Sequence, residues 1–269
     1  MRKLFMSEFG VVRNEAGEIV KILSNAEFAD GVTLLDVIQA CPTLEFLALT
    51  DNRLSEIPPE LGRLANLTHL NLSNNPLGSI PPELSNLTNL THLYMSNTQL
   101  REVPPELGQL DILRLLELNT NPMGNLTTDL GGLSDVKSLY LINTQLGSIP
   151  PELGQLANLE YLTLSNNPLG SIPPELGDLA NLTHLYLPKT QLREIPPELG
   201  RLANLRVLDL SDNPLGSIPT ELGSLTNLRS LYLPNNRFRD VPPELEHLDD
   251  LRVFTVHSNR LNRILPKRG

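Results

Sequence analysis

Residues 182–204 read LTHLYLPKTQLREIPPELGRLAN, and variants of this 23-residue stretch follow one another along most of the chain. The first eleven residues fit the pattern L-x-x-L-x-L-x-x-N-x-L, with Thr190 at the place of the asparagine. The tetrapeptide PPEL and its variants TTDL and PTEL recur at intervals of 23 residues, starting at Pro58, Pro81, Pro104, Thr127, Pro150, Pro173, Pro196, Pro219 and Pro242. We count ten copies over residues 44–265. A fixed period of this length indicates a solenoid of stacked coils.

The leucines of each copy predict a short strand with one buried face. Leucines at the fourth and sixth places alternate with other residues at the third and fifth, and alternate residues of a strand point to opposite sides. One coil cannot close a core alone, so neighbouring coils must stack, each adding a parallel strand about 4.8 Å from the last. The PPELG segment predicts one turn of helix or a 3₁₀ segment, because proline suits the first helical position.

A polar residue at the ninth place marks the turn after each strand. The chain buries backbone polar groups there, and we expect the side chain to satisfy them in the next coil. Threonine replaces asparagine in alternate copies, which gives the middle of the chain a 46-residue super-repeat of NPLGSIPPEL and NTQL. This predicted structural ladder consists of Asn52, Asn75, Thr98, Asn121, Thr144, Asn167, Thr190, Asn213, Asn236 and Asn259.

Three segments depart from the repeat. Residues 1–43 precede the first full copy, and EIVKILS with GVTLLDVIQA predicts a capping strand and helix over the end of the core. Residues 122–133 lose both prolines and gain glycine, so we expect looser packing there. After the repeats at 44–265, residues 266–269 form a basic tail, and no closing helix is evident. The predicted domains are thus 1–43, 44–265 and 266–269.

Composition narrows the class of partner. The chain has 21 basic and 31 acidic residues, a net charge of −10. Nucleic-acid binding needs a basic face, so we do not expect a nucleic acid as the partner.

The location of the protein is suggested by its cysteine and its first residues. The single cysteine, Cys41, cannot form an intramolecular disulfide, and the first residues lack the apolar run of a signal peptide. No stretch approaches the length of a membrane span. We expect a cytoplasmic protein, with a secreted or receptor-ectodomain origin as the alternative if flanking segments have been removed.

The string NPLGSIPPELGxLxNL resembles the leucine-rich-repeat family over about four fifths of the chain. The 23-residue IPPEL unit is most similar to intracellular Ras-group and Roco-type repeats, with plant receptor repeats as the near neighbour. The resemblance implies an α/β solenoid, a right-handed superhelix shaped as an arc or horseshoe, with a concave parallel sheet of about ten to eleven strands and a convex side of short 3₁₀ segments or turns. It also implies protein recognition, with small GTPases, kinases or phosphatases as partner classes.

The third and fifth places of each copy predict the residues exposed on the concave face. Every tyrosine of the chain falls there, and tyrosine is enriched at binding hot spots. We expect Tyr94, Tyr140, Tyr186 and Tyr232, about 10 Å apart on alternate strands, to anchor an extended or helical partner. The alternative is that duplication multiplied one tyrosine whose role is packing on the sheet surface. The full set of predicted binding residues is Tyr94, Tyr140, Tyr161, Tyr186, Tyr232, Glu117, Asp209, His69, His92 and His184, with Glu117 and Asp209 selecting a cation.

Neither a metal nor a catalytic site is expected. His69 and His92 lie on adjacent predicted strands, close enough to share a zinc ion, but no third ligand converges on them. Sensitivity of binding to pH near 6 is the alternative use of this pair. The sequence contains no P-loop, nucleophile-elbow, H-E-x-x-H or dinucleotide motif. We predict a non-enzymatic chain without a cofactor.

Three functions remain open from the sequence. The first is a scaffold or recruitment module that binds a protein or peptide on the concave face. The second is a sensor or receptor ectodomain for a peptide, glycan or small molecule. The third is a designed or purely structural repeat. Arg237, Arg260, Arg263, Lys267 and Arg268 also make the C-terminal end basic, which suggests end-to-end self-association as an alternative to a solvated edge.

Overall fold

The computed structural model describes residues 10–24, 33–103, 105–126, 130 and 132–262 and divides the chain into two compact units. Unit 1 consists of residues 1–123 and 129–136, and unit 2 of residues 124–128 and 137–269. The boundaries lie at 123/124, 128/129 and 136/137, the first two of them within residues 122–133 of the copy that lacks the PPEL prolines. Residues 127–129 and 131 of that copy lie outside the described residues.

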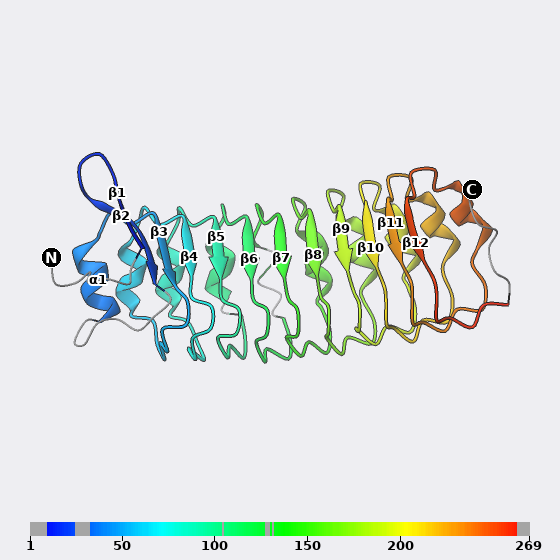
Figure 1. Ribbon diagram of the computed structural model, residues 1–269, viewed down its shortest axis with the longest axis horizontal. Coiled ribbons are helices and arrows are strands. Elements are labelled where there is room, and N and C mark those ends of the chain that lie inside the picture. The colour runs from blue at the N-terminus through cyan, green and yellow to red at the C-terminus, as the bar shows by residue number, and fades with distance from the viewer. Residues whose placement is uncertain (1–9, 25–32, 104, 127–129, 131, 263–269) are drawn as a thin grey trace. The chain divides into compact units, whose positions relative to one another are not determined.

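Unit 1 contains six strands that are paired in chain order (Figure 1). β1 and β2 form an antiparallel hairpin, and from β2 onward neighbouring strands are parallel. The Thr33 side chain and the Asp36 carboxylate form a reciprocal capping box at the start of α1. The elements are β1 (Gly10–Arg13), β2 (Ile19–Ser24), α1 (Leu34–Ala40), β3 (Phe46–Leu49), η1 (Pro59–Arg63), β4 (His69–Asn71), η2 (Pro82–Asn86), β5 (His92–Tyr94), η3 (Pro105–Gln109) and β6 (Leu115–Glu117).

Unit 2 repeats one coil without a hairpin or an α-helix among its described residues. Its strands are parallel in chain order with a register of one repeat, so that Tyr161 pairs with His184 and Tyr140 with Thr163. The elements are β7 (Ser138–Tyr140), η5 (Pro151–Gln155), β8 (Tyr161–Thr163), η6 (Pro174–Asp178), β9 (His184–Tyr186), η7 (Pro197–Arg201), β10 (Val207–Asp209), η8 (Thr220–Ser224), β11 (Ser230–Tyr232), η9 (Pro243–His247) and β12 (Val253–Thr255).

The described strands differ from the prediction in one respect. The expected ten to eleven parallel strands are confirmed by five in unit 1, β2 to β6, and six in unit 2, β7 to β12, but unit 1 has one further strand. The additional strand is β1, which precedes the repeats and folds back on β2 through a turn at Gly17. The PPELG segments form 3₁₀ helices with proline at the first or second position, which decides between the two turn types left open by the sequence.

An aliphatic core lies between the strands and the 3₁₀ helices. The leucines at the fourth and sixth places are fully buried, as Leu185 and Leu187 show in β9 and just after it. The leucine of PPEL is buried against them, for example Leu199. Burial of an aliphatic side chain contributes about 1.5–3 kcal/mol, so the repeated leucines supply most of the driving force for stacking.

The ninth-place asparagines form an amide ladder along the turn that follows each strand. In unit 2 the Oδ1 atom of Asn167 accepts hydrogen bonds from the backbone N–H groups of Thr144 (2.9 Å) and Leu146 (3.1 Å). Its Nδ2 atom donates to the carbonyl oxygens of Leu141 (2.7 Å) and Leu164 (2.8 Å). The side chain therefore reaches back to the preceding coil, and our expectation that it serves the next coil was wrong in direction.

Threonine at the ninth place cannot provide these bonds to the coil before it, and a glycine compensates. In unit 2, Asn167 is followed by a threonine coil, and the N–H of Gly170 donates to the backbone carbonyl of Thr190 (3.1 Å). Gly170 adopts φ +70° to do so, a conformation that favours glycine. Gly216 occupies the same place before an asparagine coil, and there the amide of Asn236 accepts from Leu215 instead, without a positive φ at the glycine. The 46-residue super-repeat is thus a pair of complementary coils.

Candidate functional site

The third and fifth places of each coil lie on the side of the strands opposite the core, which we call the open face. In β9, His184 and Tyr186 are half-buried, whereas Leu185 between them is fully buried. The same alternation holds at β4, β5, β6, β7, β10 and β11. All ten predicted binding residues lie on the open face of their own unit, with Tyr94, Glu117, His69 and His92 in unit 1 and Tyr140, Tyr161, Tyr186, Tyr232, Asp209 and His184 in unit 2.

Four rings on the open face of unit 2 form a continuous group, the Tyr161 cluster, made of Tyr140, Tyr161, His184 and Tyr186. The Tyr161 ring centroid lies 4.9 Å from that of Tyr140, 5.2 Å from that of Tyr186 and 5.7 Å from that of His184. Tyr161 is therefore the centre, and it lies on β8 between the strands of its partners. Ring contacts at these distances fix the side-chain orientations before any ligand arrives.

Burial within the cluster changes the acidity of two phenols. Desolvation, with the neighbouring tyrosines, raises the pKa of Tyr161 to about 12. Desolvation also raises the pKa of Tyr186, whose hydroxyl accepts a hydrogen bond from Tyr161. Thr163, which pairs with Tyr140 and Tyr186 on the adjacent strands, is 2% exposed although it occupies an open-face place.

The arrangement differs from the column of separate anchors that the sequence suggested. The rings of Tyr140 and Tyr186 do not stand alone on alternate strands, because the ring of Tyr161 fills the space between them. Tyr232 lies two strands beyond Tyr186 and makes no ring contact among the described residues. The rings thus form one aromatic patch over β7, β8 and β9.

A second aromatic group, the His69 stack, occupies the open face of unit 1. The rings of His69 and His92 are parallel within 7° at a centroid distance of 4.2 Å. Phe46 stacks on His69 at 5.3 Å, and the ammonium group of Lys21 lies 4.3 Å from the Phe46 centroid. Tyr94 closes the stack at 6.5 Å from His92.

Hydrogen bonds fix the tautomer of the three histidines. The hydroxyl of Thr183 donates its one hydrogen to the carbonyl of Glu160 (2.8 Å), so it accepts from Nδ1–H of His184 (2.8 Å). Thr68 and Thr91 hold His69 and His92 in the same way. Each neutral histidine therefore presents an unprotonated Nε2, a hydrogen-bond acceptor, to the open face.

This geometry argues against a shared zinc ion on His69 and His92. Lone pairs of stacked parallel rings point in parallel directions and do not converge on one ion. Within the described ranges, no group of three or more His, Cys, Asp or Glu side chains could hold a metal. Desolvation, with the positive charges of neighbouring side chains, lowers the pKa of His69, His92 and His184, so these imidazoles gain a proton at a lower pH than an ordinary histidine.

The two acidic residues of the open face are already engaged. Glu117 accepts from the hydroxyl of Ser96 (2.6 Å) and the amide of Asn119 (3.2 Å). Asp209 accepts from the backbone N–H (2.9 Å) and the hydroxyl of Ser211. These bonds orient both carboxylates, and each retains lone pairs for a donor on a partner.

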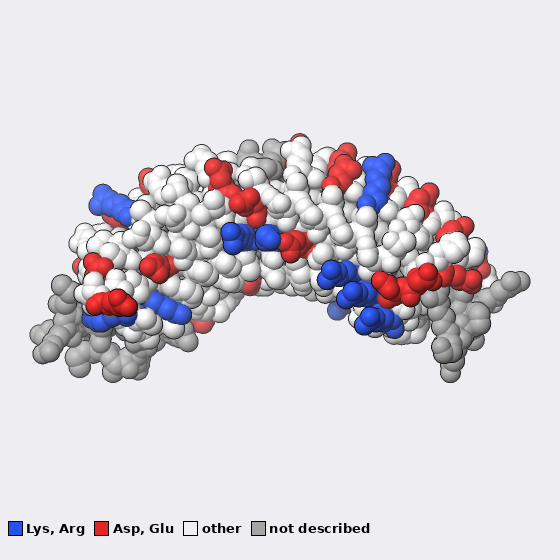
Figure 2. Space-filling view, turned by 90° about the horizontal axis from the view of Figure 1, so that it is seen from above, with Lys and Arg blue, Asp and Glu red and all other residues white. Residues whose placement is uncertain are grey.

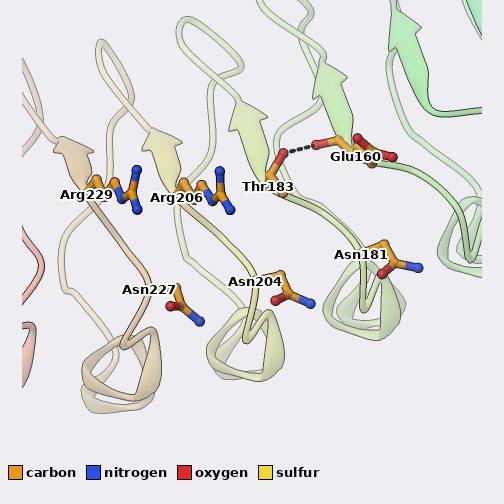
Figure 3. A pocket seen from close by; sticks show the side chains of 7 residues that line it. All are labelled: Glu160, Asn181, Thr183, Asn204, Arg206, Asn227 and Arg229. Carbon is orange, nitrogen blue, oxygen red and sulfur yellow. Dashed lines mark hydrogen bonds between the residues drawn. The ribbon is translucent and has the colours of Figure 1, made fainter.

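A basic feature that we did not predict lies at the start of the last three strands. Arg206, Arg229 and Arg252 precede β10, β11 and β12 at the second place of their coils, and all three are exposed. We call them the arginine row. Figure 2 shows a run of basic side chains bordered by acidic ones on one side of the surface, and Figure 3 shows the guanidinium groups of Arg206 and Arg229 extending in the same direction. Reading the second place of each copy, in addition to the third and fifth, would have found this row.

The C-terminal basic group is partly described. Arg237 and Arg260 lie at the same place of adjacent coils in unit 2 and line one surface depression. Arg263, Lys267 and Arg268, with the predicted tail at 266–269, lie outside the described residues. No helix in the described part of the chain has the length and apolar character that crossing a membrane requires.

Family comparisons agree with the repeat geometry. A model described as a leucine-rich repeat region matches residues 143–267, and one described as leucine-rich repeats in two copies matches 42–86 and 65–108. The chain belongs to the leucine-rich-repeat family. Its fold is the leucine-rich-repeat solenoid, built in each unit from parallel strands and short 3₁₀ turns. No match was found among curated proteins.

Solved leucine-rich-repeat structures resemble this chain closely. A leucine-rich-repeat protein of Leptospira interrogans shares 32% identity at a TM-score of 0.85, covering 91% of this chain and 61% of its own. The leucine-rich-repeat domain of the type III effector XopL shares 29% identity at a TM-score of 0.70, covering 78% and 75%. A plant peptide hormone receptor, RGFR1, in complex with RGF2 shares 27% identity at a TM-score of 0.56, covering 94% and 52%.

The leucine-rich-repeat chain spans about three fifths of the Leptospira protein that it matches, 61% of its length. Leucine-rich-repeat domains generally mediate protein–protein interaction and are typical non-enzymatic scaffolds. The family therefore indicates the general class of activity, protein–protein interaction.

Proposed function

We propose that this leucine-rich-repeat protein binds an extended segment of a protein partner on the open face of unit 2, with the Tyr161 cluster as the main contact. The observation that carries the proposal is the contiguous group of half-buried rings over β7, β8 and β9. The core of the repeats is aliphatic, so the rings are not needed to fill it. Aromatic side chains that are already held in place lose little conformational freedom on binding.

The chemistry of the cluster fits a peptide backbone with apolar side chains. Ring faces offer apolar area, while the Tyr186 and Tyr140 hydroxyls and Nε2 of His184 offer hydrogen bonds. A structural neighbour described as a plant peptide hormone receptor in complex with RGF2 gives a precedent for a peptide ligand on this fold. Small GTPases, kinases and phosphatases, the classes implied by the Ras-group resemblance, remain the proposed sources of such a segment.

Selection of displayed peptides tests the proposal. A library of random linear peptides is selected on the wild-type protein, and the enriched peptides are measured against a Tyr161→Ala/Tyr186→Ala variant and a Phe46→Ala control, which removes a ring from unit 1. We expect the double variant to bind at least about tenfold more weakly, and the control to bind as the wild type does. Circular dichroism and the urea midpoint verify that the variants are folded. Equal affinity of folded double variant and wild type would refute the proposal.

A further inference from the structure

The arginine row is a run of like charges that the protein itself does not neutralise. Across the part of the chain described by the structure, no carboxylate lies within 4.0 Å of the guanidinium groups of Arg206, Arg229 or Arg252. Their side chains also make no hydrogen bond there. Like charges at the same register of adjacent parallel strands repel one another. Among the described residues, the three arginines lie unpaired even though the chain has more acidic residues, 31, than basic ones, 21.

The same register shows that pairing between coils is available. At the second place, three and two coils before Arg206, Lys137 and Glu160 form an ion pair of 2.6 Å between adjacent coils. The next coil has the neutral Thr183, and the three arginines follow. Charges at the second place are therefore paired within the protein at Lys137 and Glu160, whereas those of the arginine row remain available to an external anion.

Further donors surround the guanidinium groups. Arg206 and Arg229 line a shallow pocket of about 300 Å³ together with Thr183 and Glu160, and its remaining lining residues are Asn181, Asn204 and Asn227 (Figure 3). Each of these asparagines uses one N–H to bind a backbone carbonyl of the preceding coil, at 2.7 to 2.8 Å. An asparagine amide has two N–H groups, so a second donor remains on each. Arginine and amide donors together suit oxyanions, and the one carboxylate in the pocket is held by Lys137.

The row also adjoins the open face. The positive charge of Arg206 contributes to lowering the pKa of His184, a member of the Tyr161 cluster. A chain that covers the cluster on β7 to β9 and continues in the same direction reaches the arginine row at β10 to β12.

We infer that the arginine row binds an acidic segment, a run of Asp or Glu side chains, in the protein partner that covers the Tyr161 cluster. The inference rests on the proposed function for the path of the partner across the strands. Carboxylates at the spacing of an extended chain, about 6.6 Å for alternate residues, can meet guanidinium groups about 4.8 Å apart on successive strands. A nucleic acid is disfavoured, because three arginines on an acidic chain do not form the broad basic surface that binds a phosphate backbone.

Fluorescence anisotropy with a labelled oligoglutamate peptide tests the inference. An Arg206→Gln/Arg229→Gln/Arg252→Gln variant is compared with an Arg63→Gln/Arg101→Gln/Arg193→Gln control, which loses the same charge at exposed positions elsewhere. We expect the wild type and the control to bind oligoglutamate, with affinity that falls as salt rises, and the row variant to bind about tenfold more weakly. An oligoserine peptide of equal length should not bind. An equal loss in both triple variants would overturn the inference.

Two further measurements separate this inference from the proposed function. Oligoglutamate has no apolar side chains, so the Tyr161→Ala/Tyr186→Ala variant should bind it as the wild type does, whatever the fate of the aromatic patch. Peptides selected on the wild type should be enriched in acidic residues, and their affinity should be lower for the variant that lacks the three arginines of the row. Tighter binding of a single-stranded oligothymidylate than of oligoglutamate would overturn the assignment to an acidic protein segment.

Discussion

At the turn of a unit 2 coil, both polar atoms of the Asn167 side chain are hydrogen-bonded and buried, whereas the open face of the same unit keeps polar groups available. The amide of Asn167 makes bonds to two coils, and its side chain is 1% exposed. Nε2 of His184 and the guanidinium of Arg206 have no bond of this kind among the described residues. The difference teaches that the polar groups of the turn are used to hold the coils together, whereas those of the open face remain available for the recognition that we propose.

Removal of the Asn167 amide should give the largest effect. Asn167→Ala leaves the buried N–H groups of Thr144 and Leu146 without their acceptor and removes one of the two side-chain bonds to the carbonyl of Leu141, which should lower the free energy of unfolding by about 3–5 kcal/mol. Asn181→Ala removes one exposed bond to Ala157 and should cost below about 1 kcal/mol. Urea denaturation followed by far-ultraviolet circular dichroism measures both. Similar losses in the two variants would contradict the division between turn and surface.

The second largest effect should be the difference in stability between alanine substitutions at Gly170 and at Gly216. Gly170→Ala places a Cβ at φ +70° and should cost about 1–2 kcal/mol. Gly216→Ala meets no atom within 4 Å and no positive φ, so stability should stay unchanged or rise by about 0.5 kcal/mol. The same denaturation experiment compares them, and equal effects would show that the threonine coil does not need its glycine.

Alkaline pH should lower the stability of the protein through Tyr161 on the open face, whereas Asn167 at the turn does not titrate. The pKa of Tyr161 is raised from 10.0 to about 12, so the folded state holds a proton that the unfolded state releases first. The stabilisation from Tyr161 is complete below pH 10 and is lost as the pH rises toward about 12. Ultraviolet absorbance and thermal unfolding follow this range. Tyr161→Phe should flatten the pH dependence of the unfolding temperature, and Tyr232→Phe should not. Identical pH profiles for the two variants would contradict a contribution from Tyr161.

The smallest effect should come from the histidines. Their folded-state pKa values lie below 6.5, so their contribution to stability is present above that pH and is lost as the pH falls through the folded values. Nuclear magnetic resonance of the imidazole protons should give midpoints below 6.5 for His69, His92 and His184. In a His69→Ala variant the His92 midpoint should rise while His184 stays constant, because His69 adds to the lowering at His92 alone.

Periodicity in the sequence accounts for most of the fold. The spacing of leucines predicted the strands, and PPELG predicted the turns on the other side, as β9 and η7 show. The antiparallel β1 escaped prediction because it precedes the repeats and has no period. The direction of the amide ladder also escaped, because a repeat specifies that a side chain meets an adjacent coil but does not specify which one.

The open-face residues were predictable in position but not in arrangement. Alternation along each strand placed Tyr140, Tyr161 and Tyr186 on one side. The register predicts that Tyr161 lies at a different place of the coil from Tyr140 and Tyr186. It does not predict that the ring of Tyr161 lies between the other two rings. The arginine row was missed because the second place lies just before each strand, outside the alternation that we followed.

By itself, the sequence determined that 23-residue coils stack on a shared aliphatic core, because regularly spaced leucines can be buried together in one way only. Tertiary structure alone decided which neighbours share a hydrogen bond or a ring contact. Those contacts join residues one repeat or more apart, and they depend on side-chain rotamers and on the backbone conformation at each turn, as Gly170 and Gly216 show with the same surrounding sequence.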